Sequence, residues 1–167
     1  MAGRLARCWA HLLHDHRRAR RVFPDALLSR IEALIGEGER THAAELRLAI
    51  EASMPVHRIW RGCTPRQRAH EVFAELGVWD TAGNNGVLLY VLLADHAVEI
   101  VADRAAAAAI PEGRWREVCE ALAAAYREGA FEQGTLTAVQ RIGVLLAAAF
   151  PAPGERADEL PNRPAIL

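Results

Sequence analysis

Residues 87–93 read Val-Leu-Leu-Tyr-Val-Leu-Leu, an unbroken apolar run of strand length. Such a run is typical of a β-strand that is buried on both faces. After residues 94–96 the chain alternates between two faces. One face carries Val98, Ile100 and Ala102, and the other carries Glu99, Val101 and Asp103. Because the break between the two segments has the length of a turn, the sequence predicts an antiparallel hairpin.

A strand and a helix are expected before this hairpin. In residues 45–51, Leu46, Leu48 and Ile50 alternate with charged side chains, which predicts a strand covered on one face. Residues 64–67, Thr-Pro-Arg-Gln, have the features of a helix start, with an N-cap, a first-turn proline and a capping-box glutamine. The order strand, helix, buried strand predicts a parallel, right-handed crossover. Residues 54–62 are expected to form a loop.

Apolar periodicity predicts further helices around this sheet. They are marked by Leu27, Leu28, Ile31, Leu34 and Ile35; by Trp115, Val118, Cys119, Leu122 and Tyr126; and by Leu136, Val139, Ile142, Leu146 and Phe150. The predicted fold class is α/β, a three-layer-like sandwich in which helices cover a small mixed sheet made of the parallel crossover and the antiparallel hairpin. We divide the chain into an N-terminal helix at residues 1–22, a folded domain at residues 23–151 and a proline-rich C-terminal tail at residues 152–167, expected on the surface.

Composition narrows the classes of protein. The length of 167 residues suits one domain, and the net charge of -1 gives no reason to expect a nucleic-acid partner. The three cysteines are widely spaced, with no Cys/His pattern typical of zinc, which indicates a reducing compartment. The N-terminus has no apolar signal region, and no apolar run reaches the ~18 residues needed to cross a bilayer. We therefore expect a cytoplasmic protein.

Several segments together resemble one family, the TPM domain. They are Asn85-Gly86-Val87-Leu88 with its buried strand, the Asp-containing turn and strand Val98-Glu99-Ile100-Val101, the opening Phe23-Pro24 with its helix, the strand at residues 44–51, and the helix at residues 66–79. The resemblance covers residues 23–151. It implies relatives among thylakoid-lumen phosphatase-like and bacterial membrane-associated proteins, and metal binding or phosphatase-like activity at an acidic cleft. One departure is that residues 102–106 read Ala-Asp-Arg-Ala-Ala, where many relatives have a glycine-containing turn.

Polar side chains gather at one predicted end of the hairpin. Glu45 opens the first strand, Asn85 opens the second, Asp103 closes the third, and Asp80 and Asn84 lie in the loop above that edge. Carboxylate and amide oxygens suit a hard cation such as Ca²⁺ or Mg²⁺. The same residues also suit structural roles. Asn84, Asn85 and Gly86 are turn formers, Asp80 suits a turn cap, and Asp103 suits an ion pair with Arg104 or Arg47.

The N-terminal helix, predicted over residues 3–21, is basic and amphipathic. Its apolar side carries Leu5, Cys8, Trp9, Leu12 and Leu13, and its end reads Arg17-Arg18-Ala19-Arg20-Arg21. Such a helix is typical of a segment that rests on an anionic membrane surface. The interpretation that we favour is that the apolar side packs against the domain or against a second copy of it, because polybasic helix ends are often only solvated.

Three functional hypotheses follow. The leading one is a non-catalytic, TPM-like partner-binding domain, cytoplasmic and peripheral to the membrane, holding a divalent cation at the hairpin edge. The second is a metal-dependent acid phosphatase in which Asp80 and Asp103 hold the metal and water is the nucleophile. The third is a soluble oligomeric scaffold assembled through the N-terminal helix.

Overall fold

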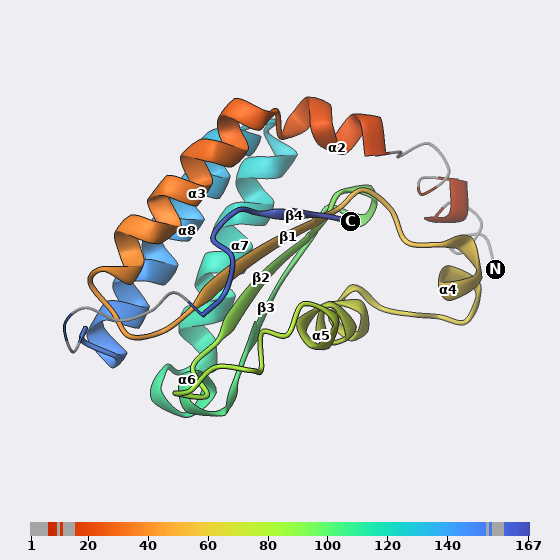
Figure 1. Cartoon of the computed structure of the whole chain (residues 1–167). Helices are drawn as coiled ribbons and strands as arrows, with labels where there is room; N and C mark the ends of the chain where they lie inside the picture. Colours follow the sequence, from red (N-terminus) through yellow and green to blue (C-terminus); the bar gives the residue numbers. More distant parts are fainter. Residues whose placement is uncertain (1–6, 10, 12–15, 153, 155–158) are drawn as a thin grey trace.

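The computed structural model describes residues 7–9, 11, 16–152, 154 and 159–167 (Figure 1). In chain order its elements are α2 (His16–Val22), α3 (Asp25–Glu39), β1 (Leu46–Glu51), α4 (Val56–Trp60), α5 (Pro65–Glu75), β2 (Val87–Leu92), the 3-10 helix η1 (Leu93–Asp95), β3 (Ala97–Ala102), α6 (Arg104–Ala109), α7 (Glu112–Arg127), α8 (Phe131–Ala149) and β4 (Ala165–Ile166). The predicted helix over residues 3–21 falls partly outside the described residues.

The sheet is mixed, with strand order β3-β2-β1-β4. β1 and β2 run parallel, with Leu46 opposite Val87, and β2 and β3 form the antiparallel hairpin, with Val87 opposite Ala102. The crossover between β1 and β2 contains α5. Its start is the predicted one, because Thr64 and Gln67 form a capping box and Pro65 is the first helical residue. These pairings confirm the predicted α/β fold class.

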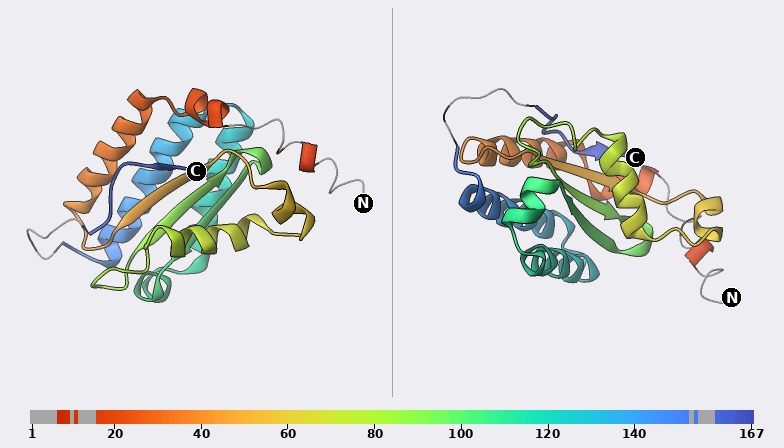
Figure 2. Two further views of the ribbon diagram at one scale, coloured as in Figure 1. Left: turned by 45° about the vertical axis from the view of Figure 1, so that its right-hand side comes forward. Right: turned by 90° about the horizontal axis from the view of Figure 1, so that it is seen from below.

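Helices cover both faces of the sheet (Figures 1 and 2). On one face α3, α7 and α8 pack against alternate residues of the strands, including Leu48, Leu89 and Ile100. On the other face α5 packs through Ala69 and Val72 against Ala49, Leu88, Tyr90, Leu92 and Val101. Strand β2 lies between these layers, and all six of its residues are buried. The apolar run is therefore the centre of a three-layer structure.

The first strand differs from its prediction as a half-covered strand. Glu45 and Glu51, expected on an open face, are buried, and Arg47 is half-buried. Arg47 donates hydrogen bonds to the carbonyl oxygens of Pro161 and Arg163. The charged face of β1 is covered because α5 and the C-terminal segment both bring polar partners to it.

Two segments without a predicted element are ordered. Residues 56–60, expected to be loop, form the short helix α4. The proline-rich tail returns to the sheet, where Ala165 and Ile166 pair in parallel with Ala49 and Ile50 as strand β4. Two residues are too short a strand for periodicity to indicate. Within the described part of the chain, no helix is long and apolar enough to span a membrane.

Candidate functional site

The polar end of the hairpin is built around Gly86. A Cβ atom at this position would lie 2.0 Å from the carbonyl oxygen of Val78, so only glycine lets the loop after α5 lie directly on the start of β2. Just before it, Asn84 has a φ of 48°, a left-handed conformation that asparagine tolerates. The Asn-Asn-Gly sequence is thus needed for the backbone path, as its turn chemistry predicts.

Asn85 is buried and only partly satisfied. Its Nδ2 donates to the carbonyl oxygen of Ala43 at 2.8 Å, and its backbone N–H donates to Thr81 Oγ1 at 3.2 Å. Its Oδ1 is buried and receives no hydrogen bond from the described residues. Buried amide oxygens are rarely left in this state.

Asp103 caps the helix that follows the hairpin. Its Oδ1 accepts a hydrogen bond from the backbone N–H of Arg104 at 2.7 Å, which places Asp103 at the N-cap of α6. Its Oδ2 is buried and receives no hydrogen bond from the described residues. The Arg104 side chain instead donates to Asn84 Oδ1 at 2.9 Å and ties the two ends of the hairpin together.

The other two predicted ligands are placed differently. Glu45 is fully buried, and its carboxylate accepts weak hydrogen bonds from the backbone N–H groups of Glu159 at 3.5 Å and Leu160 at 3.3 Å. Asp80 is exposed on the loop between α5 and β2. Among the described side chains, no group of three His, Cys, Asp or Glu residues is arranged to hold a metal ion. A cation at this edge would therefore depend on amide and backbone oxygens beside Asp103.

At the opposite end of the hairpin, Asp95 binds the N-terminal segment. Its carboxylate accepts hydrogen bonds from Arg7 Nε at 2.9 Å and Nη2 at 2.6 Å, and His11 Nε2 lies 3.0 Å away. His11 is buried, and its Nδ1 accepts the backbone N–H of Met54 at 2.9 Å, which leaves Nε2 as the donor to Asp95. Burial alone raises the pKa of Asp95, but the hydrogen bonds from His11 and Arg7 outweigh it and lower this pKa to about 2.

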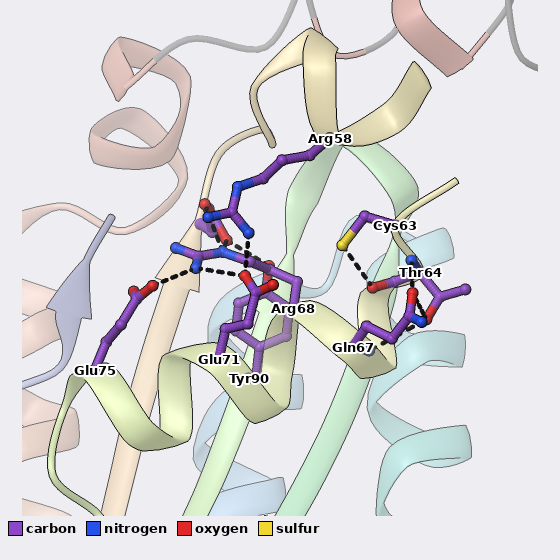
Figure 3. A network of polar contacts seen from close by, with 9 residues as sticks. Arg58, Cys63, Thr64, Gln67, Arg68, Glu71, Glu75 and Tyr90 are labelled. Atoms are coloured by element: carbon purple, nitrogen blue, oxygen red, sulfur yellow. Dashed lines mark hydrogen bonds and ion pairs between the residues drawn. The ribbon is translucent and has the colours of Figure 1, made fainter. Parts of the chain in front are cut away.

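A buried network links α5 to the sheet, and Figure 3 shows it from close by. Glu51, on β1, accepts hydrogen bonds from Tyr90 Oη at 2.6 Å and from Arg68 Nε at 2.9 Å. Arg68 Nη1 also donates to Glu75 at 2.8 Å and to Glu71 at 3.2 Å. Burial, followed by the charge of Glu51, raises the pKa of the Tyr90 hydroxyl well above its usual value.

This network is not predictable from the sequence, because its members are far apart in the chain. Glu51 was read as the solvent side of an alternating strand, and Tyr90 as one apolar residue in a run. The only signal was a tyrosine hydroxyl inside an otherwise apolar strand, since a buried Tyr O–H nearly always has a partner. Of the three acids that bind Arg68, only Glu51 is on the sheet, so the bond between Arg68 and Glu51 is the one that fixes α5 on β1.

Comparison with known proteins agrees with these observations. No functionally curated protein matches the sequence. The chain is similar to the BA42 protein of the psychrophilic bacterium Bizionia argentinensis, whose NMR structure superposes with a TM-score of 0.74. The two sequences are 26% identical, and the match covers 85% of this chain and 93% of BA42. The sequence model of the TPM domain matches residues 18–145, which include the hairpin, the crossover and both of its polar ends. This chain belongs to the TPM domain family.

Proposed function

We propose that this protein is a non-catalytic TPM domain that binds an anionic membrane surface from the cytoplasm. The observation that carries the proposal is the exposure of Trp9 and Trp60, which are 65% and 57% exposed; a third tryptophan, Trp79, is 55% exposed on the loop after α5. Tryptophan is the side chain most typical of the membrane–water interface, because its ring is apolar and its N–H is polar.

The two tryptophans lie at the same end of the molecule. Arg7 Nη1 donates to the carbonyl oxygen of Cys63 at 3.0 Å, directly after α4, and Cys8 packs in the same apolar cluster as Ile59. Figures 1 and 2 show residues 7–9 at the end of the molecule that also carries α4. The bonds from Arg7 and His11 to Asp95 hold this segment, and with it Trp9, in place.

The same N-terminal region supplies positive charge. α2 contains no acidic residue, and its Arg17, Arg18, Arg20 and Arg21 are exposed, while Ala19 between them is buried. The whole chain has a net charge of -1, so this is a local concentration of cations. Each such arginine contributes about 1 kcal/mol to binding near an anionic lipid surface.

Vesicle binding tests the proposal. We expect the protein to co-sediment with phosphatidylserine-containing vesicles at low salt and to be released when the salt concentration is raised. It should not bind vesicles of pure phosphatidylcholine. We expect that replacing Arg17, Arg20 and Arg21 with serine abolishes the binding to phosphatidylserine-containing vesicles. The matched control replaces Arg114, Arg127 and Arg141, which are exposed on α7 and α8, and retains it. Failure of the wild-type protein to bind at low salt refutes the proposal.

A divalent cation at the hairpin edge is a second candidate. The two buried oxygens without donors, Asn85 Oδ1 and Asp103 Oδ2, favour it, because oxygen ligands suit Ca²⁺ and Mg²⁺. Calorimetry of the wild-type protein and of Asp103→Asn tests it, since asparagine preserves the N-cap of α6 while removing the charge. Binding of either ion with micromolar affinity that is lost in Asp103→Asn supports the site. If neither ion gives a binding heat, the cation site is refuted.

The phosphatase alternative requires both Asp80 and Asp103 to hold the metal. Asp80 is exposed and Asp103 is a helix cap, and the glycine turn common in relatives is replaced by the start of α6. These features support the non-catalytic role. Loss of phosphate-ester hydrolysis in Asp80→Asn and Asp103→Asn, against an active wild type, would favour the phosphatase instead.

A further inference from the structure

The outer edge of strand β3 borders a cavity of about 650 Å³, which is within the range of ligand pockets in proteins. β3 is the terminal strand of the sheet on this side. The cavity runs along its residues Val98, Ile100 and Ala102 and is flanked by α5, α6 and α7. An edge strand that is bordered by a groove in this way has room beside it for one more extended chain.

The backbone of β3 presents hydrogen-bonding groups toward this groove. The N–H of Asp103 donates to the carbonyl oxygen of Gly86, so odd-numbered residues of β3 face β2 and even-numbered residues face outward. Arg66, from α5, donates to the outward carbonyl oxygen of Ile100, which confirms this orientation. Within the described part of the chain, the outward backbone groups of Val98 and Ala102 have no hydrogen-bond partner.

The walls of the groove suit an apolar peptide. Ile110 and Trp115 form part of its lining, together with Cys119. Trp115 is only 7% exposed, and its Nε1 is buried with no acceptor among the described residues. The lining therefore offers apolar surface to a chain bound along β3.

The charges around the groove balance one another. Arg66 lies 3.5 Å from Glu99, and Arg116 lies 3.5 Å from Glu112. Two cations against two anions favour neither a polyanion nor a strongly acidic peptide. An uncharged extended segment is complementary to this balance. A second folded copy of the domain fits less well, because α5 and α7 flank the strand and would meet its own flanking helices.

We propose that the β3 edge of this TPM domain binds an apolar peptide segment in extended conformation by strand addition. The incoming strand pairs with the outward groups of Val98 and Ala102 and displaces Arg66 from the carbonyl of Ile100. Arg66 is half exposed, so its displacement is feasible, and until then it covers the centre of the edge. This inference is independent of membrane binding, because it concerns another surface and is tested without lipid.

The probe is a displayed library of random heptapeptides, selected on the immobilised full chain, with affinities of the selected peptide then measured by fluorescence anisotropy. The critical variant is Val98→Pro, with Val98→Thr as its matched control. Proline removes only the outward N–H of an edge strand, a position where it is tolerated, while threonine preserves it. We expect Val98→Pro to bind about tenfold more weakly or worse, and Val98→Thr to bind as the wild type does.

Two further binding measurements, together with the oligomeric state of the wild-type protein, keep the proposal open to refutation. N-methylation of alternate residues of the peptide blocks strand pairing without altering the protein, so it is expected to abolish binding even if Val98→Pro fails to fold. Arg66→Ala frees the Ile100 carbonyl and is expected to tighten binding. No enriched peptide, unchanged binding after both blocks, weaker binding of Arg66→Ala, or a wild-type dimer lost in Val98→Pro each overturns the proposal.

Discussion

Arg7 Nη2 lies 2.6 Å from Asp95 Oδ2, so a side chain near the start of the sequence is bonded to the hairpin turn 88 residues later. With His11, this pair bonds the N-terminal segment to the hairpin turn, in addition to the bond from Arg7 to Cys63 and the packing of Cys8. The sequence indicates only a turn at residues 94–96. In the structure the Asp95 carboxylate in that turn holds Arg7 and His11.

The bonded Asp95 predicts an acid-sensitive contribution to stability. Its folded-state pKa of about 2 lies below its ordinary value of 3.8, so the unfolded state takes up the proton first as the pH falls. The stabilisation, ~2 kcal/mol, is complete above about pH 4 and is lost as the pH approaches 2. Urea unfolding between pH 2 and 6 measures it. The Asp95→Asn curve should be flatter over this interval, and parallel curves for the two proteins would contradict the prediction.

The buried network predicts that substitutions of two arginines will lower the free energy of unfolding by very different amounts. Arg68→Met leaves the Glu51 carboxylate buried without its cation and should cost about 3–5 kcal/mol. Arg114→Met, the control, breaks an exposed pair with Glu117 and should cost less than about 1 kcal/mol. Tyr90→Phe, which removes one donor to Glu51, should cost about 1–3 kcal/mol. Chemical denaturation measures all three, and equal costs for the two arginines would show that Glu51 is hydrated.

Alanine substitutions at Gly86 and Gly143 are predicted to change stability in opposite directions. Alanine at Gly86 places a methyl group against the carbonyl oxygen of Val78 and should cost about 3 kcal/mol or more, because backbone rather than a flexible side chain must move. Alanine at Gly143, inside α8, meets nothing within 4 Å and should stabilise the protein by about 0.5–1 kcal/mol. Thermal unfolding gives both signs. A neutral Gly86→Ala would mean that the loop after α5 is not held on β2.

The C-terminal segment predicts two graded losses of stability. Deleting residues 164–167 removes β4 and the hydrogen bond from Leu167 N–H to the Ile50 carbonyl oxygen. Deleting residues 159–167 also removes the backbone donors to Glu45 and the carbonyl oxygens that Arg47 binds, and should be costlier by at least about 1–3 kcal/mol. Thermal unfolding and hydrogen exchange of the β1 amides test this order. Equal melting temperatures for the two deletions would remove the assigned role of Glu45.

Most of the fold could be predicted from local sequence patterns. The apolar run of β2, the alternation of β3 and the capping box of α5 each depend on residues within a few positions, and all three appear in the structure as predicted. Long-range partners were not predictable in the same way. Glu51 is buried beside the hydroxyl of Tyr90, 39 residues later, and Glu45 accepts a hydrogen bond from the backbone N–H of Leu160, 115 residues later.

The hairpin edge shows the same limit for a site. Topology predicted that Asn85 and Asp103 would lie at one end of the sheet, since neighbouring strands begin and end there. Topology does not predict that Glu45 would bind the C-terminal segment or that Arg104 would donate a hydrogen bond to Asn84. Those contacts depend on the conformations of a loop and of the C-terminal tail, which sequence periodicity does not predict.

The parallel pairing of β4 with β1 also has a consequence for biosynthesis. When the ribosome has delivered residues up to 152, both helical layers and three strands can already be in place, yet the outer edge of β1 has no described strand beside it. That edge stays open to other nascent chains until residues 159–167 emerge. Pairing of β4 with β1 therefore covers a strand edge that would otherwise be exposed to association with other chains.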